Sequence, residues 1–162
     1  MNVLASPVVV MTPAVAVAAA PHNQTEQVMA VWDTGATGSV ITQKVVDDLG
    51  IAPIGLTQVH GVNSVEISPV YLVDFYFTLN DVRFAGLNVT LGQLPGSDAL
   101  IGMDVITTGD FVITNRGGKT KMSFRVPSQA DIDYVVETNR LMAKAAKGRY
   151  TPPGGGRPGR RK

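Results

Sequence analysis

Apolar and polar residues alternate over long stretches of the chain with the two-residue period of half-buried β-strands. Residues 71–79 show this most clearly, because aromatic or aliphatic side chains occupy every second position there. Asn80 and Asp81 then favour a turn, and residues 82–91 resume the pattern, with Gly86 at a position that predicts a β-bulge. The strongest local pattern in the sequence therefore predicts antiparallel β-structure.

Shorter runs of the same kind extend the β prediction to most of the chain. Residues 56–70 predict a long hairpin that bends at residues 61–64, where glycine and asparagine tolerate the backbone of a tight turn. Thr42 and Gly50 are expected to begin and end a short helix, and a helical turn is expected at residues 103–108. Further strands are predicted at residues 13–20, 27–32, 39–41, 99–102, 111–114 and 120–126. The expected fold class is all-β with one or two short helices.

The pattern changes after Pro127. Ser128 is expected to cap a helix that reaches about Lys147 and carries its apolar side chains on one side. Residues 149–162 hold too few apolar side chains to offset the entropy of ordering, so they are predicted to be disordered. The sequence thus predicts a domain at residues 1–127, a C-terminal helix at 128–148 and a basic, Pro/Gly-rich tail at 149–162.

Composition removes several classes of function. The chain has no cysteine and only two histidines, and these do not form a metal-ligand pair, so neither a metal nor a cofactor is expected. The net charge is +1, but Arg and Lys residues gather in the tail and leave the rest of the chain mildly acidic. A nucleic-acid partner is therefore expected at most through the tail.

The first twenty residues are apolar and end in an alanine-rich run that resembles a signal-peptide cleavage site. No Lys or Arg precedes this run, and Pro7 and Pro13 interrupt it. A hairpin that continues to Trp32 explains the segment better. Secretion and membrane insertion are not favoured, and a cytoplasmic location is expected.

Candidate chemistry centres on Asp33, Thr34 and Gly35, which follow the predicted strand at residues 27–32. Two adjacent carboxyl groups that share one proton can activate water and protonate a peptide carbonyl together. Thr34 offers a hydroxyl for a backbone contact, and Gly35 lets its amide approach the carboxylate without a Cβ clash. The three residues are ordinary turn formers, so the tripeptide alone is a weak signal.

The sequence around this tripeptide strengthens the signal. The string Ala30-Val31-Trp32-Asp33-Thr34-Gly35-Ala36-Thr37-Gly38-Ser39-Val40-Ile41 predicts strand, loop and strand, and Ala99-Leu100-Ile101-Gly102-Met103-Asp104 follows much later in the chain. Over about residues 13–126 this pairing resembles the retropepsin-like aspartic proteases. The resemblance implies a closed β-barrel, a two-fold homodimer that acts on polypeptides, and a flap hairpin near His60 to Ser64.

The resemblance also implies roles for individual residues. Asp33 takes the catalytic position, Thr34 and Gly35 support the dyad, and Ala36 contacts the substrate backbone. The chain has a single Asp-Thr-Gly, so a two-lobed enzyme is excluded and the second carboxylate must come from another copy. The expected function is that of an aspartic endopeptidase.

Two positions depart from the retroviral pattern. Retroviral members usually have Asp after the alanine of this loop and Arg after the glycine of the later segment, whereas this chain has Thr37 and Met103. Absence of both the Asp and the Arg is physically reasonable, since absence of only one would leave the charge of the other partly buried and unpaired. The chain is closer to the retrotransposon-like and bacterial or phage branch, and strands at residues 2–11 and 120–126 are candidates for holding the dimer together.

Several alternatives remain open at this point. A catalytically silent, retropepsin-like module that binds peptides would keep the same fold, and a third hypothesis makes the basic tail primary, with the β-domain as a dimerising platform. Asp104 and Asp110 are expected to serve the ends of a helix or turn, and His60 is left out of the site. Gly118-Lys119-Thr120 lacks the first glycine of a phosphate-binding loop, and no serine has the setting of a nucleophile.

Overall fold

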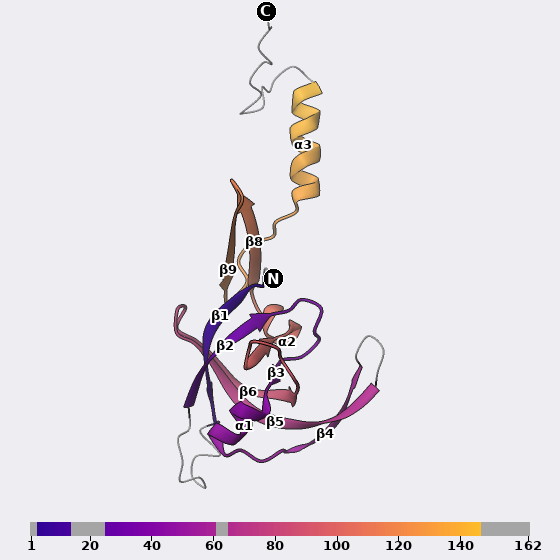
Figure 1. The fold of residues 1–162 in the computed structure, drawn as a ribbon. Helices are drawn as coiled ribbons and strands as arrows, with labels where there is room; N and C mark the ends of the chain where they lie inside the picture. Colours follow the sequence, from indigo (N-terminus) through magenta and orange to yellow (C-terminus); the bar gives the residue numbers. More distant parts are fainter. Residues whose placement is uncertain (1–2, 14–24, 61–64, 147–162) are drawn as a thin grey trace, which may run out of the picture. The chain divides into compact units, whose positions relative to one another are not determined.

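The computed structural model describes residues 3–13, 25–60 and 65–146 (Figure 1). The chain divides into two compact units, Met1–Gln129 and Ala130–Lys162. The first unit contains all the described β-strands, and the second contains one described helix, α3 (Tyr134–Ala146). The tail predicted to be disordered lies outside the described residues.

Six strands of the first unit close into a barrel. Neighbouring strands follow the order β1-β2-β7-β3-β6-β5, and a pairing between β1 and β5 completes the ring. The strands are β1 (Ala5–Met11), β2 (Thr25–Trp32), β7 (Ala99–Ile101), β3 (Val40–Ile41), β6 (Val82–Leu91) and β5 (Val65–Phe77). The expected all-β, closed-barrel fold is confirmed.

The barrel core consists of the inward-facing residues of the alternating strands. Val8, Val10, Phe75 and Val89 are fully buried, as expected for every second residue of a strand with one face in the core. Helix α1 (Gln43–Leu49) adds three more buried side chains, namely Val45, Val46 and Leu49. The positions of its ends match the prediction, because Thr42 precedes it and Gly50 ends it with a φ of 61°. The Thr42 hydroxyl does not cap the helix, however, and donates to the Asp98 carboxylate at 3.4 Å instead.

The predicted hairpin at residues 56–70 extends beyond the barrel as an arm (Figure 1). Strand β4 (Gly55–His60) pairs antiparallel with the first half of β5, from Gly55 opposite Val70 to His60 opposite Val65. All six residues of β4 are exposed. The bend at residues 61–64 lies outside the described residues.

A buried carboxylate organises the β-bulge that the sequence predicted at Gly86. Val73 pairs with Leu87 while Phe75 pairs with Phe84, so β6 has one extra residue at this point. The intervening Asp74 is only 1% exposed. Its Oδ1 accepts the Gly86 N–H at 2.7 Å, and its Oδ2 accepts bonds from the Arg83 guanidinium, with Nε at 2.9 Å.

The ribbon of β8 (Asp110–Arg116) and β9 (Lys119–Arg125) forms a separate two-stranded sheet. Gly117 and Gly118 connect the strands, and both have the positive φ angles of a two-residue hairpin turn. At the base of the ribbon, the Asp110 carboxylate accepts hydrogen bonds from Arg125, from the Ser128 hydroxyl and from the Gln129 amide. These donors hold the pKa of Asp110 well below its ordinary value, the Ser128 hydroxyl having the largest effect.

Two details of the sequence-based prediction were wrong. The partner of β2 is Ala5–Met11 rather than residues 13–20, of which 14–20 lie outside the described residues. Residues 9–11 pair with both β2 and β5, whereas residues 5–8 pair with β2 alone among the described strands, so the role of the N-terminal segment in holding a dimer stays a prediction. Helix α3 starts at Tyr134, because the Asp133 carboxylate caps it by accepting the amides of Val135 and Val136, whereas Ser128 bonds to Asp110 instead.

Among the described residues, no helix has the length and hydrophobicity needed to span a bilayer.

The buried Asp74 predicts a large effect of its partner on stability. Replacing Arg83 with alanine leaves an almost fully buried carboxylate without its cation and should lower the free energy of unfolding by about 3 kcal/mol. Lys44→Ala is the control, because Lys44 pairs with Glu26 and Asp48 on the surface and should contribute little. Urea denaturation measures both, and equal effects would contradict this assignment.

The lowered pKa of Asp110 predicts a pH dependence with a defined sign. A carboxylate with a depressed pKa in the folded state stabilises the fold above its unfolded pKa, and this contribution is lost as the pH falls toward the folded value. The difference in unfolding free energy between wild type and Asp110→Asn should therefore stay constant from about pH 5 to 7 and shrink below about pH 4. Denaturation across this range checks the sign, with Asp48→Asn as a surface control.

Candidate active site

The loop after β2 holds Asp33 at the end of a strand that is fixed on both sides. Strand β2 pairs antiparallel with β1 and parallel with β7, and the Asp33 N–H extends the second pairing by donating to the Ile101 carbonyl at 3.0 Å. The Ala36 N–H closes a turn on the Asp33 carbonyl at 3.3 Å. The backbone of the candidate catalytic residue is thus part of the barrel, while its side chain stays half-buried.

The Asp33 carboxylate is oriented by its own loop. Its Oδ1 accepts the Gly35 N–H at 2.8 Å, and a Cβ on Gly35 would lie only 3.2 Å from that oxygen. This is the close amide approach for which a glycine was expected at this position. Thr34 is exposed next to the carboxylate, and Ala36 is half-buried.

A buried polar contact locks the loop against the segment that contains β7 and α2 (Met103–Ile106). Ser39 is 1% exposed, and both of its hydrogen-bond donors bind Asp104: the amide to Oδ2 at 3.0 Å and the hydroxyl to Oδ1 at 2.8 Å. The Ser39 hydroxyl also accepts the Gly102 N–H at 3.1 Å, and the Met103 N–H donates to the Ala36 carbonyl at 2.9 Å. Two segments about 65 residues apart in sequence are therefore joined by a network of hydrogen bonds.

Gly102 is required for this contact. A Cβ at Gly102 would lie 2.5 Å from both the carbonyl carbon and the oxygen of Gly38, and 3.1 Å from the Ala36 oxygen. The loop passes so close to β7 that only a glycine fits between them. This explains why the short apolar strand ends in glycine, a feature that the resemblance identified without its cause.

Sequence reasoning missed Ser39 and assigned Asp104 only to the end of a helix. Asp104 does lie in the first turn of α2, but its two oxygens bind Ser39. The signal was the presence of Ser39 directly before the apolar Val40-Ile41, because a polar residue at a position that faces the core requires a buried partner. Nothing in the sequence indicated which residue that partner is.

An open groove of about 620 Å³ runs between the Asp33 loop and the β4 arm. Loop residues 35–38 line one side and residues 57–60 of β4 line the other. Ala36, predicted to contact substrate, lies in the loop wall, and His60, which was left out of the site, lies in the opposite β4 wall. Asp33 and Thr34 belong to the same loop but do not line the groove themselves. Thr37, one of the two departures from the retroviral pattern, also lines the groove.

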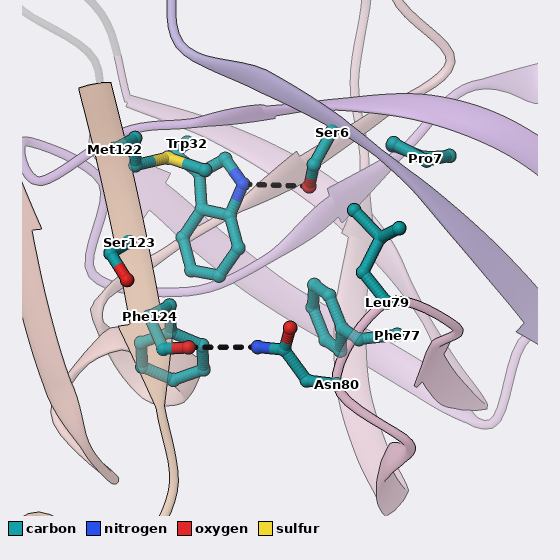
Figure 2. A pocket seen from close by; sticks show the side chains of 9 residues that line it. All are labelled: Ser6, Pro7, Trp32, Phe77, Leu79, Asn80, Met122, Ser123 and Phe124. Carbon is teal, nitrogen blue, oxygen red and sulfur yellow. Dashed lines mark hydrogen bonds between the residues drawn. The ribbon is translucent and has the colours of Figure 1, made fainter.

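Aromatic side chains support the strand that leads to Asp33. Trp32 is buried, and its ring centroid lies 5.5 Å from that of Phe77, 5.4 Å from Phe111 and 4.9 Å from Phe124. Figure 2 shows the pocket of about 150 Å³ beside this cluster, where the Trp32 Nε1 donates to the Ser6 hydroxyl at 2.9 Å. The Asn80 amide donates to the Phe124 carbonyl at 2.8 Å across the same pocket. The cluster joins β2 to the base of the β8–β9 ribbon.

The contact at Gly102 predicts a specific sensitivity. Gly102→Ala forces a methyl group into the Gly38 carbonyl and should lower the free energy of unfolding by about 3 kcal/mol, because neither backbone segment can move aside. Gly38→Ala is the matched control on the opposite side of the contact. A Cβ there meets nothing within 4 Å, so a change of about 0.5 kcal/mol or less is expected. Urea denaturation followed by Trp32 fluorescence measures both.

Comparisons with known structures retrieve aspartic proteases at low similarity. EIAV protease complexed with the inhibitor HBY-793 aligns with a TM-score of 0.47 and 17% identity over 65% of this chain and 86% of that chain. A retropepsin-like aspartic protease from Rickettsia conorii aligns with a TM-score of 0.43 and 15% identity, over 70% and 88%. The foamy viral protease-reverse transcriptase in complex with an RNA/DNA hybrid gives 0.41 and 15%, over 88% of this chain and 15% of that one. No curated protein sequence matches the chain.

The family assignment rests on a sequence model. The family described as "Aspartyl protease" matches residues 8–105, which is more than half of the chain. The matched residues include the Asp33 loop, the β4 arm and the segment through Gly102 that packs against the loop. The resemblance on which the sequence analysis relied is confirmed, and the chain belongs to the aspartyl protease family.

Proposed function

We propose that this protein is an aspartic endopeptidase whose active site forms between two copies of the chain, each supplying one Asp33. The observation that carries the proposal is an Asp33 carboxylate oriented by the Gly35 amide, in a loop that is locked to the barrel and borders an open groove. Such preorganisation is what a catalytic carboxylate requires. The family of the chain supports peptide-bond hydrolysis as the reaction.

The need for a second copy follows from the residues around the groove. Asp33 lies in the loop that borders this groove, and among the described residues no second carboxylate lines the groove. Asp104, which contacts the loop, uses both oxygens to bind Ser39. A dyad therefore requires a carboxylate from outside the chain, and a two-fold pair supplies it with the same Asp33 loop.

The proposed chemistry is general acid–base catalysis by the pair. Two carboxyl groups about 3 Å apart cannot both ionise easily, so they share one proton over a broad pH range. The ionised group takes a proton from water, and the protonated group donates to the peptide carbonyl oxygen as the tetrahedral intermediate forms. Thr34 would bond across the two-fold axis, and Gly35 and Ala36 would contact the substrate backbone.

The β4 arm supports an extended polypeptide as the substrate. Its exposed residues include Leu56 and Val59, which are 73% and 37% exposed, and Ile67 on the paired part of β5, which is 71% exposed. A strand with exposed apolar side chains beside a groove suits a peptide that binds in extended conformation. We propose that the hairpin of β4 and β5 closes over the bound peptide as a flap.

The shared dyad predicts that an inactive subunit inhibits an active one. Asp33→Asn should abolish hydrolysis, since an amide can act neither as the base nor as the acid. When equal amounts of wild type and Asp33→Asn exchange subunits, about half of the wild-type subunits enter mixed dimers, so activity should fall to about one half. The rate at which the mixture cleaves a peptide library measures this activity.

Asp48→Asn serves as the control, because this exposed carboxylate on α1 is remote from the loop, and mixing it in should change nothing. A wild-type activity that stays constant as Asp33→Asn is added would contradict a shared site. Equal binding of a hydroxyl-containing transition-state analogue to wild type and Asp33→Asn would instead indicate a peptide-binding module without catalysis.

A further inference from the structure

Helix α3 exposes a stripe of mostly apolar side chains along one side, with Thr138 as a polar member. The helix has 13 residues, and none of its side chains is buried. Tyr134, Val135 and Met142 are each more than 60% exposed, and Leu141 is 37% exposed. An isolated helix of this length is marginally stable in water, and packing of an apolar face is the usual source of its stability.

The stripe follows a heptad pattern. Positions four and three residues apart recur along one side of the helix, which is the spacing of a helix that pairs with another helix. Large side chains and small ones alternate along the centre of the stripe. The central positions are Tyr134, Thr138, Leu141 and Ala145, and Val135 and Met142 flank them on one edge.

Size complementarity favours an antiparallel arrangement of two such helices. In an antiparallel pair with Leu141 opposite Thr138 of the other copy, Tyr134 lies opposite Ala145 of that copy, so each layer combines a large side chain with a small one. In a parallel pair, each residue would lie opposite the same residue of the other chain. Two tyrosines would then share one layer and two alanines another, which leaves the layers crowded or empty.

Charge complementarity gives the same answer independently. Glu137 and Lys144 are one heptad apart on the other edge of the stripe, and within the described residues neither forms an ion pair. In the antiparallel register above, Glu137 of each copy lies opposite Lys144 of the other, which makes two reciprocal pairs. In a parallel register, Glu137 would lie opposite Met142 and neither charge would be paired.

We propose that α3 pairs with α3 of a second copy of this chain, antiparallel and two-fold symmetric, through the stripe centred on Leu141. The inference rests on the proposed function, because the second copy is the one that the shared dyad requires. It adds an interaction surface outside the barrel. Two heptads are short for a stable coiled coil, so the helix pair assists assembly: once α3 is paired, the barrels attached to it through residues 126–133 stay at high effective concentration.

Complementation between two charge variants tests the pairing. An E137K chain carries two basic side chains on this edge and a K144E chain carries two acidic ones, so each should repel its own copy. Each variant alone should need several-fold, roughly 3- to 10-fold, more protein to dimerise than wild type. Their equimolar mixture should dimerise within about twofold of the wild-type concentration, because both cross pairs become complementary.

Arg140→Glu is the matched control for K144E, since it makes the same change from a basic to an acidic side chain on a side of α3 away from the stripe and should leave dimerisation unchanged. Leu141→Asp places a charge in the centre of the stripe and should weaken dimerisation at least about tenfold. Sedimentation equilibrium on full-length chains that also carry Asp33→Asn measures association without any contribution from catalysis. Circular dichroism verifies that helix content is retained.

The outcomes separate this inference from the proposed function. If the mixture dimerises no better than either variant alone, the antiparallel helix pairing is overturned. That result is expected if α3 packs on its own barrel or pairs in parallel. Wild-type behaviour of E137K and K144E alone also overturns it, while leaving the shared dyad intact. Full complementation together with an active Asp33→Asn enzyme would support the pairing and refute the proposed catalysis.

Discussion

The position of the Asp33 carboxylate depends on a buried polar contact, in which Asp104 accepts two hydrogen bonds from Ser39 and the Ser39 hydroxyl accepts one from the Gly102 amide. Ser39 is buried and Asp104 is half-buried, and such polar groups are costly unless they are bonded, so this arrangement tolerates little displacement. The loop cannot move away from β7 without leaving Ser39 and Asp104 unsatisfied. It cannot move closer either, because Gly102 is already in contact with the backbone of Gly38.

The pairing of the barrel strands explains why the Asp33 loop can pack so closely against β7. Strand β7 lies between β2 and β3, which are the strands on either side of the Asp33 loop. The parallel pairing with β2 and the antiparallel pairing with β3 therefore hold both ends of the loop on one strand. On the far side of β2, Trp32 packs among phenylalanines from β5, β8 and β9. Precision at Asp33 thus comes from the barrel, as a preorganised site requires.

The described strands close into a barrel, whereas the proposed site needs a second copy of the chain. The groove beside Asp33 is open, the β4 arm exposes apolar side chains on both faces, and α3 exposes its whole apolar stripe. In the proposed function a peptide occupies the arm and groove, and a second copy of the chain contacts the loop and the helix. With Thr37 and Met103 at the positions of the retroviral Asp and Arg, the proposed dimer would lack the ion pair that these residues form. The proposed pairing of α3 would add association strength outside the barrel, because it raises effective concentration without altering the Asp33 loop.

Local patterns in the sequence were sufficient to predict most strands, the ends of α1, the bulge at Gly86 and the loop that carries Asp33, because alternation, capping and turn preferences act over a few residues. They predicted the start of α3 wrongly, since Ser128 and Asp133 both suit a cap and only the fold assigns Ser128 to Asp110. The partner of β2, the parallel pairing with β7 and the contact of Ser39 with Asp104 were decided by the tertiary structure alone. These features depend on which distant segments meet when the barrel closes, and residues that are 65 positions apart leave no local pattern that identifies them as partners.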